Sequence, residues 1–228
     1  MSARTTRPFT RAAVLNPAAG DHRITSDPRE LAAARAAGER TLAAYPYFTR
    51  RYGESGRAFA TSDGAWIATL ASEDDERATE QLLWLGRVLA SRGMPRVLLE
   101  VHLRTLAREL RRAVPARARA YAQLDRAAET LAAARRAHVD DAALAAISRR
   151  FDADAGAPWA SRLPHSGALL ASAVADERDG IGNAVASLEP WFTDGERFPP
   201  RFAAAVKTAL AAARAAAEAR AAPGRRPR

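Results

Sequence analysis

Apolar positions recur along most of this chain at spacings of three and four residues, which is the pattern of amphipathic α-helices. One run places Leu82, Leu85 and Leu89 on a single face, and a second run aligns the leucines at positions 99, 103, 106 and 110. No segment alternates between apolar and polar residues over a convincing length. The sequence therefore predicts an all-α protein, a multi-helix bundle of about 8–10 helices.

Capping residues indicate where these helices begin and end. Asp27-Pro28 combines an N-cap acid with a proline at the first helical position, which predicts a helix to about residue 44. Acids at 73–75 predict a helix that ends at Gly93, and Pro95 opens the next, which Pro115 interrupts. Further helices are expected over 116–137, 140–151, 167–175, 181–192 and 200–221, with a loop over 152–165.

Two parts of the chain are similar to each other. Gly64–Thr69 matches Gly167–Ser172, and Thr49–Tyr52 matches Ser148–Phe151. The glycines, acids and prolines that mark the helix ends occur in the same order in both parts. One interpretation is a duplicated helical unit, with the two copies related by a pseudo-twofold axis. The alternative is chance agreement between two stretches rich in Ala, Leu and Arg.

The residues that mark helix ends also predict a domain organisation. We expect a basic, flexible N-terminal segment at 1–26 and a first helical unit at 27–115. A connecting helix at 116–137, polar on most sides, would lead to a second helical unit at 138–221. An Arg-rich C-terminal tail at 222–228 would complete the chain.

Composition excludes several classes of function. The chain has no cysteine, which excludes disulfides, thiolate nucleophiles and thiolate metal sites, and favours a cytoplasmic location. No apolar run reaches the roughly 18 residues that a membrane span needs. The four histidines are dispersed, and no paired-histidine or glycine-rich phosphate motif is present. These observations disfavour an enzyme.

The formal net charge of +9 is concentrated at the two ends of the chain. Residues 1–23 hold four arginines and one acid, whereas residues 201–228 hold seven basic residues and one acid. The stretch between them therefore carries equal numbers of acidic and basic groups. A weak, nonspecific nucleic-acid contact by the C-terminal tail, with polyanion binding through the Arg-rich termini, is one hypothesis for function.

A second hypothesis is a sensor that binds a flat ligand such as haem or another tetrapyrrole. His102 lies on the apolar face of its predicted helix, where an imidazole can ligate haem iron. Aromatic residues concentrate nearby in the sequence, and among them Tyr52 and Trp66 could contact a flat ring. Arg50 and Arg51 could pair with its carboxylates. A buried, purely structural histidine is the alternative.

The stretch from Trp84 to Leu110 combines a helix, a Gly-Met-Pro break and a second amphipathic helix. Over some 30 residues it resembles the helical, globin-like sensory domains of bacterial signalling proteins. The resemblance includes no diagnostic motif and assigns no functional residue.

The first hypothesis remains a non-enzymatic helical binding or interaction module. The middle of the chain is neutral, the helix pair at 73–112 is sharply amphipathic, and no catalytic constellation is visible. Such a module would bind a protein partner, or a second copy of itself, through its amphipathic helices.

Overall fold

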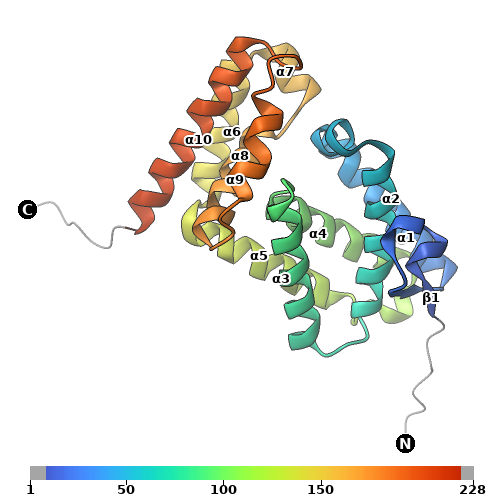
Figure 1. Ribbon diagram of the computed structural model, residues 1–228. Helices are drawn as coiled ribbons and strands as arrows, with labels where there is room; N and C mark the ends of the chain where they lie inside the picture. The colour runs from blue at the N-terminus through green and yellow to red at the C-terminus, as the bar shows by residue number, and fades with distance from the viewer. Residues whose placement is uncertain (1–8, 222–228) are drawn as a thin grey trace, which may run out of the picture. The chain divides into compact units, whose positions relative to one another are not determined.

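The computed structural model describes residues 9–221 and confirms the all-α fold (Figure 1). Ten α-helices account for most of the described residues: α1 (Pro28–Ala44), α2 (Pro46–Leu70), α3 (Asp75–Ser91), α4 (Arg96–Ala113), α5 (Ala122–His138), α6 (Asp141–Ala155), α7 (Ala157–Arg162), α8 (Ser166–Arg178), α9 (Ala184–Phe192) and α10 (Pro200–Ala221). A duplication of one helical unit is not shown by this arrangement. The Arg-rich tail at 222–228 lies outside the described residues.

A short hairpin precedes the helices. Strands β1 (Phe9–Arg11) and β2 (Arg23–Thr25) pair antiparallel, with two short 3-10 helices, η1 (Ala12–Val14) and η2 (Pro17–Ala19), between them. Ala12 and Ile24 are fully buried. The structure therefore differs from the expected flexible segment over residues 9–26. Strands of three residues are too short to give a period-two pattern that the sequence could reveal.

The helices fall into two groups of residues that contact one another closely. Unit 1 comprises the described residues up to Ala43, Phe48–Leu82 and Val101–Ala127. Unit 2 comprises Ala44–Tyr47, Leu83–Glu100 and the described residues from Ala128 onward. Both units are discontinuous in sequence, whereas the expected units 27–115 and 138–221 are continuous ranges, and that division stays a prediction.

Glycines shape α2 in unit 1. Gly53 has a φ of +58° and a ψ of −147°, so that the helix kinks there instead of running straight. At Gly56 a Cβ atom would lie 2.6 Å from Tyr52 Cβ and 2.7 Å from the Phe48 ring. The kink therefore divides α2 into a short first part and a longer second part.

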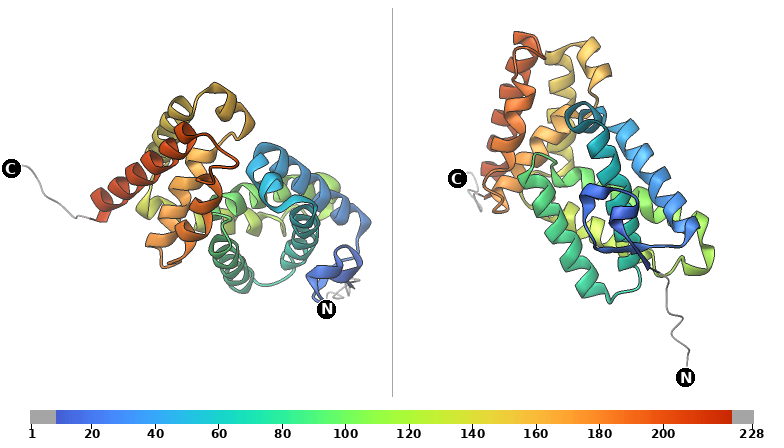
Figure 2. Two further views of the ribbon diagram at one scale, coloured as in Figure 1. Left: turned by 45° about the horizontal axis from the view of Figure 1, so that its top comes forward. Right: turned by 45° about the vertical axis from the view of Figure 1, so that its right-hand side comes forward.

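Helices α6, α8 and α10 form the core of unit 2 and lie side by side (Figures 1 and 2). The predicted loop at 152–165 is wrong, because α6 continues to Ala155 and α7 follows almost at once. Gly156, with φ of +91°, makes the turn, and Pro158 lies in the first turn of α7, where a proline is tolerated.

The expected connecting helix is shorter and more buried than its composition suggested. A 3-10 turn, η3 (Pro115–Arg117), comes first, and α5 begins only at Ala122. Leu124 and Leu131 are fully buried. Alanine fills much of this buried face, and a small apolar residue marks a core position less clearly than leucine does.

Candidate functional sites

His102 lies on α4 in unit 1, next to α1. Its Nδ1 is 3.2 Å from the hydroxyl oxygen of Thr41. Thr41 donates its only hydroxyl proton to the Ala37 carbonyl oxygen at 2.9 Å, so its oxygen accepts the Nδ1 proton. These two hydrogen bonds fix the proton on Nδ1 and leave a lone pair on Nε2.

The packing around His102 keeps its ring neutral. Burial lowers the pKa of His102 to about 4, because removal from water disfavours the charged imidazolium. Nε2 lies 3.6 Å from the place that a Cβ atom on Gly64 would occupy, and Ala34 Cβ lies 3.3 Å from the same point. The neutral ring therefore lies against two small residues, with an Nε2 atom that can accept a hydrogen bond or ligate a metal.

The other four residues expected at the flat-ligand site are all on α2. Trp66 meets His22 edge-to-face at 6.4 Å between ring centroids. Tyr52 lies 5.1 Å from the Phe48 ring, and the Arg51 guanidinium lies 5.1 Å from the Tyr52 ring centroid. Arg50 is exposed. These contacts place Trp66 beside His22 and Tyr52 beside Phe48, and a pocket shared with His102 stays a prediction.

The aromatic residues form their largest cluster in unit 2. Trp191 contacts Tyr47, Phe192 and Phe198, with ring centroids 5.0 to 5.2 Å apart. Trp159 and Phe202 extend the cluster. Most of these residues are spread over 159–202 in the sequence, whereas the aromatic residues at 45–66 lie close together. In space they are the denser group, and they pack the core.

A buried ion pair joins α4 to α8 in unit 2. The Arg96 Nε donates to Asp176 Oδ1 at 2.7 Å, and the Arg96 backbone N–H donates to Asp176 Oδ2 at 2.9 Å. Both side chains are almost completely excluded from solvent. A second acid, Asp179, lies 2.8 Å from Arg96 Nη1 and is partly exposed.

These contacts also cap a helix. Arg96 and Val97 are the first two residues of α4, whose backbone N–H groups have no acceptor within the helix. Asp176 Oδ2 accepts the first of these N–H groups, and the Ser172 hydroxyl accepts the second at 3.3 Å. Two side chains one turn apart on α8 thus perform the role that a local N-cap usually performs.

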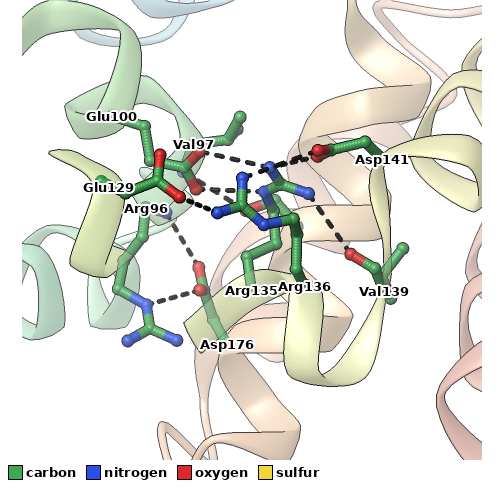
Figure 3. A network of polar contacts seen from close by, with 10 residues as sticks. Arg96, Val97, Glu100, Glu129, Arg135, Arg136, Val139, Asp141 and Asp176 are labelled. Atoms are coloured by element: carbon green, nitrogen blue, oxygen red, sulfur yellow. Dashed lines mark hydrogen bonds and ion pairs between the residues drawn. The ribbon is translucent and has the colours of Figure 1, made fainter. Parts of the chain in front are cut away.

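A second buried ion pair lies close to the first (Figure 3). Arg135 Nε donates to Glu100 Oε1 at 3.1 Å, and Arg135 Nη2 donates to Asp141 Oδ1 at 2.7 Å. Arg135 Nη1 donates to the Val139 carbonyl oxygen at 3.3 Å. One guanidinium therefore connects α4, α5 and the start of α6.

Burial and charge act against each other in this network. Burial raises the pKa of Asp176 to about 6, although Arg96 favours the ionised carboxylate, and Glu100 adds to the rise. Burial also opposes the charge of Arg96, but Asp176 and Asp179 outweigh it and raise the pKa of Arg96. The Arg96 Nη2 atom is buried without a hydrogen-bond partner among the described residues.

The sequence analysis missed this network, because the helix that it predicted over 167–175 ended before Asp176. The structure places it near the C-terminal end of α8, which begins at Ser166. A signal was nevertheless present, because Ser172 and Asp176 are spaced by four in the stretch 167–176, where every other residue is Ala, Gly, Leu or Val. Polar residues at buried positions are usually satisfied by specific partners, and Arg96 was the unrecognised partner.

The outer face of α3 exposes an unusual residue. Trp84 is 60% exposed, which places it among the few large exposed hydrophobic residues of the described chain. Val88, one turn later, is half-buried. Exposed acids at Glu76 and Glu80 precede Trp84 on this face, and the exposed Arg87 follows it.

The described residues form neither a metal-binding group nor a helix that could cross a membrane. Residues 9–221 contain no group of three His, Asp or Glu side chains arranged to hold a metal ion. Among the helices of this part of the chain, none combines the length and apolar character that a membrane crossing requires. No protein-family model, no curated protein and no solved structure matches this chain, so function must be argued from its own residues.

Proposed function

We propose that this protein is a non-enzymatic helical interaction module that pairs with a second copy of itself through the outer face of α3. The observation that carries the proposal is Trp84, a residue that is 60% exposed on a well-formed helix. Tryptophan is among the residues whose burial contributes most to protein interfaces. An exposed tryptophan on a rigid helix is therefore a strong candidate for an interface centre.

The charges around Trp84 favour a second copy as the partner. In an antiparallel pair of α3 helices with a twofold axis near Trp84, positions equally far before and after Trp84 face each other. Glu80 lies four residues before Trp84 and Arg87 three residues after it. Position 88 of the other copy would then face Glu80, and the neighbouring Arg87 of that copy would lie beside the Glu80 carboxylate.

Charge reversal tests this geometry directly by sedimentation velocity. Glu80→Arg alone and Arg87→Glu alone each place like charges opposite one another, so each variant should dissociate into monomers. Mixing the two single variants should produce a heterodimer, because every contact then pairs opposite charges. The double variant Glu80→Arg/Arg87→Glu should self-associate again. Single variants that dimerise as well as the original chain would contradict the proposal.

Truncation of the tryptophan provides a second measurement. Trp84→Ala should weaken self-association by about 2 kcal/mol or more, close to a thirtyfold rise in the dissociation constant. Val14→Ala is the matched control, because Val14 is 72% exposed but does not lie on α3. The control should leave the dissociation constant unchanged. A strictly monomeric original chain at high concentration would remove the proposal.

A flat-ligand sensor remains a second candidate, and the state of His102 favours it. The ring is neutral and its Nε2 carries the lone pair that haem ligation needs. Gly64 packs close to Nε2, so this part of α2 would have to move to admit a ligand. A haem titration followed by visible absorbance tests the idea. His102→Ala should abolish any ligated spectrum, whereas His138→Ala should preserve it.

A further inference from the structure

Three arginines in unit 1 converge on one carboxylate. Arg40 Nε on α1 and Arg108 Nε and Arg112 Nη1 on α4 lie 3.5, 3.6 and 3.4 Å from the same atom, Glu109 Oε1. The Glu109 side chain is 10% exposed, whereas each arginine side chain is more than half exposed. We call these four residues the Glu109 cluster.

The Glu109 cluster carries excess positive charge. One carboxylate can neutralise one of the three guanidinium groups. The three distances exceed the roughly 2.7–2.9 Å of strong charge-assisted hydrogen bonds, so none of the pairs is tight. Each guanidinium carries five N–H donors, of which Glu109 can use only a small part. An anion that approached this surface would therefore meet both charge and hydrogen-bond donors.

The exposed face of α4 extends this charge into a line. Arg104, Arg108 and Arg112 are all exposed and follow one another at intervals of four residues. Successive members of such a row rise by about 6 Å along a helix axis and lie on the same face. A row of positive charges is complementary to a chain of phosphates, and it exceeds what a single phosphate could contact.

We infer that the Glu109 cluster, together with Arg104, is a docking surface for the phosphodiester backbone of nucleic acid. Binding occurs through phosphate contacts, which fix position but carry no sequence information. The surface does not favour a membrane, because membrane-surface helices also present large apolar side chains. The large exposed hydrophobic residues of the described chain are Phe9, Val14 and Trp84, and none of them lies on α4.

The test is fluorescence anisotropy of a labelled 20-base-pair DNA duplex of arbitrary sequence, titrated with the full chain at several salt concentrations. Arg108→Ala/Arg112→Ala should weaken binding and reduce the slope of log affinity against log salt by about 1.8, since each phosphate contact contributes about 0.9. Glu109→Gln should have the opposite effect and strengthen binding, because it removes the only negative charge of the cluster. If these residues served packing alone, both variants would break the same contacts and would not move affinity in opposite directions.

Two controls identify the source of any binding. Lys207→Ala/Arg214→Ala removes two exposed positive charges from α10, and it should leave the slope almost unchanged. Arg225→Ala/Arg226→Ala/Arg228→Ala tests the C-terminal tail. The proposal is overturned if the tail variant abolishes binding while the α4 variant does not. It is also overturned if the α4 variant loses binding to phosphatidylserine vesicles but not to DNA, or if the original chain binds no DNA at low salt.

Discussion

Gly167 is the position where a single methyl group should do the most harm to unit 2. It is the second residue of α8 and faces α6. A Cβ atom there would lie 2.7 Å from Ser148 Cα, 2.8 Å from Phe151 Cβ and 3.1 Å from the Ile147 carbonyl oxygen. We therefore predict that Gly167→Ala destabilises the α6–α8 interface.

The size of the effect follows from these distances. Carbon atoms in contact normally lie about 3.5–4.0 Å apart, so the new methyl would be too close to two carbons by about 0.7–0.8 Å. Two of the three crowded atoms belong to the backbone and cannot rotate away, so α6 and α8 would have to separate. Overpacking of this kind costs about 1–3 kcal/mol. The helix propensity of alanine offsets at most about 1 kcal/mol in a helix interior, and less in the first turn.

Gly38→Ala on α1 in unit 1 is the matched control. Its Cβ atom would meet only Ala60 Cβ, at 4.0 Å, which is an ordinary contact. The control should be neutral or stabilising by up to about 1 kcal/mol, since it gains helix propensity without a clash. Urea unfolding followed by circular dichroism gives the free energy of unfolding for both variants. A Gly167→Ala variant as stable as Gly38→Ala would refute the close packing of α6 on α8.

Two further predictions concern pH. Burial raises the pKa of Asp176 from 3.8 to about 6. Between these two pH values the folded chain holds a proton that the unfolded chain releases. The free energy of unfolding should therefore fall as pH rises from about 4 to about 6. Denaturant titrations across this range should lose that slope in Asp176→Asn. For His102 the pKa is lowered from 6.5 to about 4, so its contribution has the opposite sign and is lost as pH falls from about 6.5 towards 4. Histidine NMR titration should show His102 still neutral at pH 5.5, and a resonance that titrates near 6.5 would contradict the packing described for its ring.

Helix positions were predictable wherever the chain carries local signals. Pro28, Pro95 and Pro200 each stand at or just before the first residue of an observed helix, as the fixed φ of proline favours. The loop predicted over 152–165 was wrong because proline and glycine were taken as markers of a loop. Pro158 instead lies in the first turn of α7, and Gly156 supplies a single tight turn. Proline and glycine therefore marked the positions of the turns correctly. Whether the residues between two turns form a helix depends on tertiary packing, which the sequence pattern does not show.

The internal similarity does not reveal the structural setting of the residues that it matches. Gly64 and Gly167 are matched by the internal similarity, and both lie where helices approach closely. Their settings differ, since Gly64 is inside the long α2 and Gly167 is at the start of α8. A shared need for a small residue at a helix contact is enough to explain this matched pair, and a duplication of the two units is not shown.

The sequence analysis could not locate these charged sites, because the net charge of a stretch does not show which charges lie close together in the folded chain. The neutral middle of the chain contains two arrangements with opposite physical consequences. In unit 2, Arg96 and Arg135 are buried with their acids, so their charges are matched and they hold helices together. In unit 1, three exposed arginines share Glu109, so charge is left over at the surface. Burial, and not residue type, therefore distinguishes the two sets of arginines. An arginine that is buried with its own carboxylate contributes to the fold. An arginine that shares one carboxylate with others at the surface keeps charge that can attract a partner.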